Sequence, residues 1–265
     1  MLRTKFYYLY TIIWCLLLTF ICGFNPTLGS TSTDGLQITT KQIRKQFKAK
    51  RVDLSAEYPK LIGKSSAGIT GFNQNAKLRV MKELDEFKKH WINFPPANLK
   101  LLQGSNVFMK IGYHVEYTDN NLISVNFRTS RYSIKMSHVT DSFSINYDLK
   151  NGKELELADL FKHNTKYLEI ISEHCLKELR SRKDNLKTPD ISGIINTLAS
   201  DDLTNAVAPE TENFKKWNIT PDGLMFSFNP YIVGPYPVEP EIIIVPYDKL
   251  KDMIKPNGIL AQITQ

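Results

Sequence analysis

Histidine is the residue type in this chain best suited to binding a metal or to moving a proton near neutral pH. Zinc sites commonly use histidines three to five positions apart. The chain has five histidines, separated by 24, 24, 25 and 11 residues: His90, His114, His138, His163 and His174. The last gap spans about 16 Å along a helix, so even the nearest pair cannot share an ion. The spacing predicts no metal site, and the sequence indicates no other cofactor.

Other catalytic patterns are missing as well. The segment "GKSS", which begins at Gly63, lacks the first glycine of a phosphate-binding loop, and no G-x-S-x-G sequence occurs. Cys175 falls on the apolar side of an expected helix, which favours a core thiol over a nucleophile. Asp201 and Asp202 are adjacent, whereas glycoside hydrolysis needs two carboxylates on either side of a sugar. We expect that the chain is not an enzyme; the alternative is a hydrolase whose site does not show in the spacing.

Three residues remain as candidates for ligand binding. His138 is expected in a loop between two strands, where it can contact a ligand or respond to pH; the alternative is a solvated loop histidine. Tyr231 and Tyr236 flank the stiff pair Gly234-Pro235 and can form a contact surface for a glycan or a protein. The alternative is that Tyr231 packs into the core while Tyr236 covers the edge of a sheet.

Alternating apolar residues predict the strands that position these side chains. Residues 107–117 and 123–127 give two long strands, and a strand from Val52 is expected to end at Pro59. The segment "SFSINYDLKNGKELELADLF" predicts a hairpin, with Asn151 and Gly152 at the two positive-φ positions of its turn. Apolar residues three and four apart predict helices over 73–91 and 165–182. Together these elements predict an α+β fold, an antiparallel sheet of hairpins with inserted packing helices.

The N-terminal residues predict export from the cytoplasm. Arg3 and Lys5 precede a 19-residue apolar stretch from Phe6 to Phe24, and the small-residue segment "TLGS" follows. This arrangement is typical of a secretory signal peptide, with cleavage expected near Gly29. The alternative is an uncleaved transmembrane anchor, since about 20 apolar residues span a bilayer. In both cases the rest of the chain is expected in an extracytoplasmic location, periplasmic, secreted or held at the membrane only through its N-terminal segment.

The chain is mildly basic. Removing Arg3 and Lys5 with the leader lowers the net charge from +7 to +5. The segment "KQIRKQFKAKR", Lys41 to Arg51, holds six basic and no acidic residues. It can contact an anionic wall polymer or lipid head groups, or it can be a solvated face that leads into a strand. The expected location argues against nucleic acid as a partner, even where lysines precede an aromatic ring at Trp217.

The order of elements resembles a known family. The motifs are "AEYPKLIG", "GFNQNAKLRVMKELDEF", "YHVEYTDNNLISVNF", "SINYDLKNGKELELADLF", "NFKKWNITPDGLMFSFNPYIVGPY" and "EIIIVPYDKL". The chain is similar, over about residues 45–254, to the extracytoplasmic region shared by RsiV-type anti-sigma factors and the non-catalytic part of PdaC-type peptidoglycan deacetylases. The resemblance divides the chain into a leader at 1–29, a PdaC-like strand-helix region at 30–104, an RsiV-like domain at 105–256 and a tail at 257–265.

The resemblance implies a role in binding. In RsiV this region binds lysozyme, and in the deacetylases it accompanies a separate catalytic domain. We therefore expect a non-catalytic binding module of the bacterial envelope, for peptidoglycan or a lysozyme-like protein; the alternative is an envelope hydrolase. The sequence departs from the family pattern at Met136-Ser137-His138 and at Pro235 to Pro240, so a site that uses these two loops would be altered.

Overall fold

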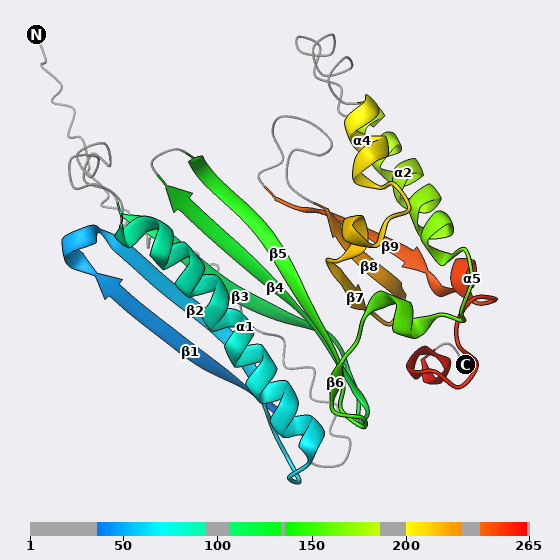
Figure 1. The fold of residues 1–265 in the computed structure, drawn as a ribbon, viewed down its shortest axis with the longest axis horizontal. Helices are drawn as coiled ribbons and strands as arrows, with labels where there is room; N and C mark the ends of the chain where they lie inside the picture. The colour runs from blue at the N-terminus through cyan, green and yellow to red at the C-terminus, as the bar shows by residue number, and fades with distance from the viewer. Residues whose placement is uncertain (1–35, 94–105, 134–135, 186–199, 229–238, 264–265) are drawn as a thin grey trace, which may run out of the picture. The chain divides into compact units, whose positions relative to one another are not determined.

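Two β-sheets form the framework of the chain (Figure 1). The computed structural model describes residues 36–93, 106–133, 136–185, 200–228 and 239–263. The larger sheet has six strands in the order β1 (Gln37–Phe47), β2 (Val52–Ile62), β3 (Val107–Thr118), β4 (Leu122–Ser133), β5 (Met136–Asp148) and β6 (Lys153–Glu154). The smaller sheet consists of β7 (Trp217–Ile219), β8 (Gly223–Phe228) and β9 (Glu241–Pro246).

Helices pack against both sheets, which confirms the expected α+β class. The α-helices are α1 (Ala67–Ile92), α2 (Tyr167–Asn185), α4 (Ser200–Ala206) and α5 (Tyr247–Leu250). The short 3-10 helices are η1 (Lys48–Lys50), η3 (Leu157–Leu160), η4 (Thr211–Phe214) and η5 (Ile259–Gln262). No helix of the described residues combines the length and the apolar character that crossing a membrane requires. The apolar stretch from Phe6 to Phe24 lies outside the described residues.

Among the described residues the strands pair antiparallel with one exception, which the sequence did not predict. β2 and β3 run parallel over five pairs, from Val52 with Val107 to Ala56 with Ile111, and α1 makes the connection between them. A parallel pair needs such a crossover, because a tight turn joins only antiparallel strands. The pairing also joins strands from both sides of the expected boundary at residues 104 and 105. The division into two regions stays a prediction.

One face of the larger sheet packs on α1 and forms the first core. Phe72, Ala76, Val80 and Leu84 recur every four residues on α1, and each is at most 2% exposed. They meet the apolar side chains of β2 to β5, among them the stacked rings of Phe127 and Phe143. This spacing is the helical period predicted from the sequence. The other face of the sheet therefore carries the polar half of each strand.

β2 continues through Pro59, where the sequence predicted an end. Pro59 pairs with Thr40 of β1, and the strand runs on to Ile62. β2 contacts β3 only as far as Ala56, so Pro59 lies in a stretch with a partner strand on one side only. A proline is tolerated there because the missing N–H costs no ladder hydrogen bond on the free side.

The N-terminus of α1 lies on the turn of the β5–β6 hairpin. The helix begins at Ala67, six residues before the predicted start, and the Ser66 side chain accepts a hydrogen bond from the backbone N–H of Ile69. A Cβ atom placed on Gly68 would lie 1.8 Å from the carbonyl oxygen of Leu149. Glycine at this position therefore lets the helix backbone touch the turn, a packing reason that helix propensity does not include.

The hairpin itself forms as predicted, but with a different turn. Leu149 to Gly152 make a four-residue connection, and only Gly152 has positive φ, at 69°. Both carboxylate oxygens of Asp148 accept hydrogen bonds from Asn151, one from its backbone N–H and one from its side chain. The Tyr147 hydroxyl donates to the carbonyl oxygen of Gly152 over 2.8 Å. The segment is scaffold: it holds its own turn and receives the start of α1.

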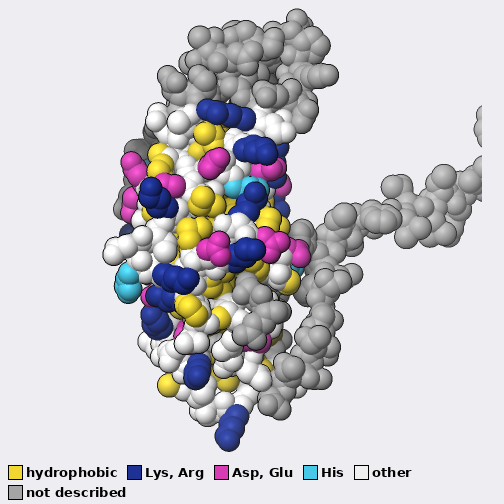
Figure 2. Space-filling model, turned by 90° about the vertical axis from the view of Figure 1, so that its right-hand side faces the viewer, with side chains coloured by type: hydrophobic (Ala, Val, Ile, Leu, Met, Phe, Trp, Pro, Cys, Tyr) yellow, Lys and Arg dark blue, Asp and Glu magenta, His cyan; other side chains and the backbone are white. Residues whose placement is uncertain are grey.

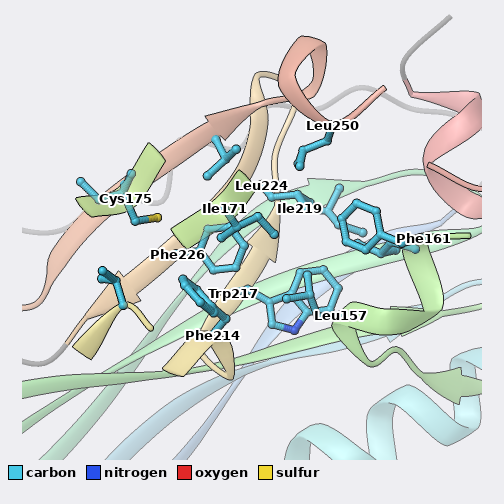
Figure 3. Close-up of a cluster of buried hydrophobic side chains, with 14 of the residues drawn as sticks. Leu157, Phe161, Ile171, Cys175, Phe214, Trp217, Ile219, Leu224, Phe226 and Leu250 are labelled. Atoms are coloured by element: carbon cyan, nitrogen blue, oxygen red, sulfur yellow. The ribbon is translucent and has the colours of Figure 1, made fainter. Parts of the chain in front are cut away.

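The smaller sheet, α2 and the C-terminal helices enclose the second core (Figure 3). Ile171 and Cys175 of α2 point towards Phe214 and Phe226, and all four side chains are at most 1% exposed. On the outer side of β9, the side chains of His174 and Arg182 reach the carbonyl oxygens of Ile244 and Ile242 at 3.0 and 2.8 Å. α2 therefore both fills the core and covers the edge of the sheet.

The two sheets meet through a buried polar network, beside the apolar contact that Leu122 of β4 makes with the second core. The edge strand β7 lies on β4 and β5, and the Asn146 side chain donates to the carbonyl oxygen of Trp217 over 2.8 Å. The Ser124 hydroxyl accepts from the backbone N–H of Ile219 and donates to Asn146. Asn218 donates to Ser124 in turn. These side chains satisfy the backbone groups of β7 that no neighbouring strand pairs.

The Gly68 contact predicts a large effect from a single added methyl group. Gly68→Ala should lower the free energy of unfolding by about 1–3 kcal/mol, because the helix must shift away from Leu149. Gly112→Ala is the matched control, since a Cβ atom there meets no atom within 4 Å. Urea melts of both variants measure the difference. Equal stability of the two variants would contradict the proposed contact.

The polar network predicts that Asn146 is the critical side chain between the sheets. Asn146→Ala leaves Ser124 and the Trp217 carbonyl group without this partner, which should cost about 2–4 kcal/mol of unfolding free energy. Asn75→Ala, which removes a partly exposed hydrogen bond to Glu154, should change stability by less than about 1 kcal/mol. Chemical denaturation checks both, and a loss at Asn146 no larger than at Asn75 would refute the role.

Candidate binding site

His138 lies within a strand, not in the loop predicted from the sequence. It is the third residue of β5, because β4 and β5 stay paired up to Ser133 and Met136. The connection between the strands is therefore too short to hold it. Its side chain is exposed, and its Nε2 atom lies 2.6 Å from the Ser130 hydroxyl of β4.

Three aromatic side chains gather at this end of the larger sheet. Phe108 of β3 and Tyr132 of β4 are directly paired, and their rings stack with centroids 6.0 Å apart and planes 19° apart. The His138 ring lies 6.1 Å from the Phe108 ring. Phe108 and Tyr132 are half-buried, so part of each ring contacts solvent. We call Phe108, Tyr132 and His138 the aromatic cluster.

The cluster belongs to the polar face, the face of β1 to β5 that points away from α1. Register places residues of neighbouring strands in rows across this face, because paired residues point to the same side. One row consists of Gln46, Asp53, Phe108 and Tyr132, and the next consists of Arg44, Ser55, Lys110 and Ser130. Asp53 accepts a hydrogen bond from Asn106 over 2.6 Å. The face thus presents aromatic rings beside hydroxyl, amide and basic groups, a set suited to binding a polar ligand with flat apolar surfaces.

The smaller sheet covers one end of the polar face. The hydroxyl groups of Ser142 and Ser227 lie 2.6 Å apart in the contact between β5 and β8. Arg128 of β4 forms an ion pair with Glu239, which precedes β9. Tyr231 and Tyr236 lie outside the described residues, so their contacts stay a prediction. Of the described ends of their segment, Glu239 contacts the polar face through Arg128, and Phe228 pairs with Glu241 of β9.

The other histidines lie on separate elements. His90 contacts the Trp91 ring on α1, and His114 lies 3.3 Å from a carboxylate oxygen of Glu116 on β3. His174 binds the Ile244 carbonyl group. In the part of the chain that the structure describes, no three side chains able to ligate a metal come together.

Charge is mixed on the side of the molecule that α2 and α5 form. Figure 2 shows basic and acidic side chains interspersed there, with hydrophobic side chains between them. Such a mixture is ordinary for a solvated surface and favours no ligand of one charge. The row of Arg44 and Lys110 on the polar face differs, since both of its charged members are basic.

Sequence reasoning missed most of the residues of the polar face. It recorded Val107, Met109 and Ile111 as the apolar side of β3, and the same alternation implied a polar side with Phe108 and Lys110. The sequence does not give the register of the strands. Register places Tyr132 and Arg44 on the same face of the sheet as Phe108 and Lys110. Phe108, an aromatic residue at a position of β3 that the alternation assigns to the polar side, was the sequence signal for this surface.

Comparison with known proteins supports the resemblance. Residues 158–248 match the family model described as protein of unknown function, DUF3298. These residues, from η3 to α5, contribute most of the second core. The chain is also 26% identical over 180 residues to peptidoglycan-N-acetylmuramic acid deacetylase PdaC of Bacillus subtilis (strain 168). The alignment covers 67% of this chain and 35% of the deacetylase, so the chain spans about a third of that relative. The resemblance to a PdaC-type region is confirmed.

A solved structure shares the fold. A member of the DUF3298 family from Bacteroides fragilis NCTC 9343 aligns with a TM-score of 0.61 at 18% identity, over 88% of this chain and 99% of that chain. A DUF3298 family protein from Pseudomonas aeruginosa PAO1 aligns with a TM-score of 0.45 at 12% identity, over 85% of this chain and 96% of that one. The first similarity shows that both sheets occur together in another protein.

The burial of Cys175 predicts an unreactive thiol. Desolvation raises its pKa to about 12, and the nearby Glu178 carboxylate adds to the shift. With Cys15 and Cys22 replaced by serine, Cys175 at pH 8 should react with a disulfide reagent roughly a thousandfold more slowly than an exposed cysteine. Ser65→Cys, at an exposed position before α1, supplies the comparison. Fast labelling of Cys175 in the folded chain would show that the thiol is accessible and would reopen a nucleophilic role.

Proposed function

We propose that the chain is an extracytoplasmic protein of the bacterial envelope whose polar face binds cell-wall glycan without chemically altering it. The observation that carries the proposal is the aromatic cluster, in which the Phe108 ring stacks with Tyr132 and lies 6.1 Å from His138 on an otherwise polar face. The leader predicted at residues 1–29 supports the location.

The cluster suits a sugar ring for physical reasons. A sugar presents C–H groups on its ring faces and hydroxyl groups around its edge, so it needs an apolar surface and hydrogen-bonding groups in the same place. Phe108 and Tyr132 offer partly exposed rings, while Ser130, Asp53 and Gln46 lie at neighbouring positions of the same face. Sites of this kind bind through a few aromatic contacts and oriented polar groups.

The comparison with the deacetylase points to the same ligand. Its name states that it acts on peptidoglycan, and this chain matches about a third of its length. We infer that the matched region holds the wall polymer near a separate catalytic domain, and that this chain retains the holding role. A lysozyme-like protein is the other ligand considered, and it enters the test as a second probe.

An envelope hydrolase is the alternative function. It requires a histidine and carboxylates that converge in one cleft. Among the described residues, His114 lies beside a single carboxylate, that of Glu116, and no larger group of this kind forms. No observation in the described part of the chain favours this alternative.

Removing the aromatic rings tests the proposal. Phe108→Ala with Tyr132→Ala should weaken retention on purified peptidoglycan about tenfold, since aromatic contacts contribute about 0.5–1.5 kcal/mol each. Leu78→Ala is the control, because Leu78 is an exposed apolar residue on α1, 57% exposed and away from the polar face. Co-sedimentation at low salt measures retention.

The outcomes separate the candidates. Retention that falls in the double variant and not in Leu78→Ala supports glycan binding at the cluster. Capture of lysozyme without retention on peptidoglycan would replace the glycan by a protein partner. Release of new reducing ends or free acetate from peptidoglycan would make the chain an enzyme, and failure to bind either probe would refute the proposal.

A further inference from the structure

We propose that a basic row across the polar face binds the carboxylates of an anionic cell-wall glycan. The row consists of Arg44, Ser55, Lys110 and Ser130, on four neighbouring strands. The inference rests on the proposed glycan binding and specifies the charge of the ligand. It assigns to Arg44 and Lys110 a contact that neither the fold nor the aromatic cluster requires.

The register of the sheet places these four side chains on one face. Arg44 pairs with Ser55, Ser55 with Lys110, and Lys110 with Ser130. Arg44 and Lys110 are exposed, and the two serines between and beside them are half-buried. A strand spacing of about 4.8 Å puts the backbones that carry the two cations about 10 Å apart. The row therefore alternates a basic group and a hydroxyl group across the sheet.

The basic side chains of the row are not paired with the carboxylates beside them. Asp53 and Glu57 flank Ser55 on β2, but Asp53 accepts from Asn106 and Glu57 from Gln42. Within the described ranges, Arg44 and Lys110 form no ion pair at 4.0 Å or less. Two basic side chains on one open row attract an anion, and the neighbouring hydroxyl groups can donate hydrogen bonds to it.

Of the basic residues in the segment Lys41 to Arg51, only Arg44 belongs to the basic row. Arg44 points to the polar face, whereas its neighbour Lys45 pairs with Leu54 on the side of α1. Lysines along an exposed edge strand such as β1 commonly prevent pairing with other chains, which explains Lys41 and Lys45 without a ligand. Protection of the edge does not explain why Arg44 lies in the same row as Lys110.

The distance between rows fits a sugar with an acidic substituent. The basic row lies two residues along each strand from Phe108 and Tyr132, about 7 Å away. A ring stacked on the aromatic cluster can therefore extend a carboxylate to Lys110. Muramic acid carries a lactyl group beside its ring, and the carboxylate of this group is free where the stem peptide has been removed. A peptide-free glycan strand of peptidoglycan that lies across the strands therefore matches both rows.

Gly112 leaves room for such a strand. It follows Lys110 on the same face of β3, pairs with Arg128, and a Cβ atom on it would meet nothing within 4 Å. Its φ angle is not in the left-handed region, so neither backbone conformation nor packing calls for glycine. Glycine inside a strand weakens the strand and often marks a place where a ligand approaches the backbone.

The test compares two forms of one ligand. Glycan strands freed of their stem peptides carry lactyl carboxylates, and coupling these groups to methylamine gives a neutral strand of the same length. Isothermal titration at low salt should show tighter binding of the carboxylate strand by the unaltered chain. Arg44→Gln with Lys110→Gln should weaken that binding about three- to tenfold and leave the neutral strand unaffected, as expected for two exposed ion pairs.

Lys45→Gln with Lys82→Gln is the matched control. It removes the same charge from the opposite side of β1 and from α1, and it should leave both affinities unchanged. Urea melts of both double variants check that the fold is intact. Raising the salt concentration should reduce the preference for the carboxylate strand in the unaltered chain and not in the Arg44, Lys110 variant.

The possible results distinguish this inference from the function on which it rests. Equal affinity for the two strands would overturn the basic row and leave glycan binding in place. A preference for carboxylate that survives Arg44→Gln with Lys110→Gln would place the anion elsewhere and would also overturn it. Binding of neither strand would overturn both proposals.

Discussion

The contact between the edge of β7 and the polar face of the larger sheet decides how the two cores are joined. An edge strand leaves backbone groups unpaired, and burying them without partners costs about 1–3 kcal/mol each. Ser124 and Asn146 supply those partners to Ile219 and Trp217. Because hydrogen bonds are directional, this contact fixes the position of the smaller sheet on the larger one. An apolar contact alone would bury surface area without fixing that position. The smaller sheet covers one end of the polar face, and towards the other end Lys110 is exposed and Phe108 is half-buried.

Side-chain alternation separates two roles within the same strands. On β3, Val107, Met109 and Ile111 fill the first core, while the residues between them face away from α1. The core positions tolerate few changes because interiors are close-packed, whereas the positions between them can vary without loss of the fold. A ligand surface on this face can therefore be adjusted residue by residue on a constant framework. This separation agrees with the shared fold at 18% identity, since similar frameworks need not carry the same surface.

The sequence predicted the parts of the fold that depend on local pattern. Alternation identified β3 to β5, and the four-residue spacing of Val80 and Leu84 identified the middle of α1. It failed where distant residues decide. Gly68 precedes the predicted helix of residues 73–91, yet it belongs to α1, where its backbone packs against Leu149. Pro59 predicted the end of a strand, yet β2 continues to Ile62. The pairing of β2 with β3 ends at Ala56, so Pro59 has a partner strand on one side only. His138 was the one candidate site residue that the structure describes, and its partner Phe108 became apparent only through the pairing of β3 with β4. Tyr231 and Tyr236 lie outside the described residues, so their role remains a prediction.

The short parallel pairing of β2 with β3 has a consequence for the order of folding. β1 with β2, and β3 with β4 and β5, are hairpins whose partners are close in the sequence, so each can form early at a small cost in chain entropy. The five parallel pairs join residues that are far apart in the chain and must await α1. Arg44 and Ser55 lie on one side of that late junction, and Lys110 and Ser130 lie on the other. In a newly synthesised or partly unfolded chain, each half of the basic row can therefore form while the two halves remain apart. The complete row exists only after β2 and β3 have paired, which is a late step of folding.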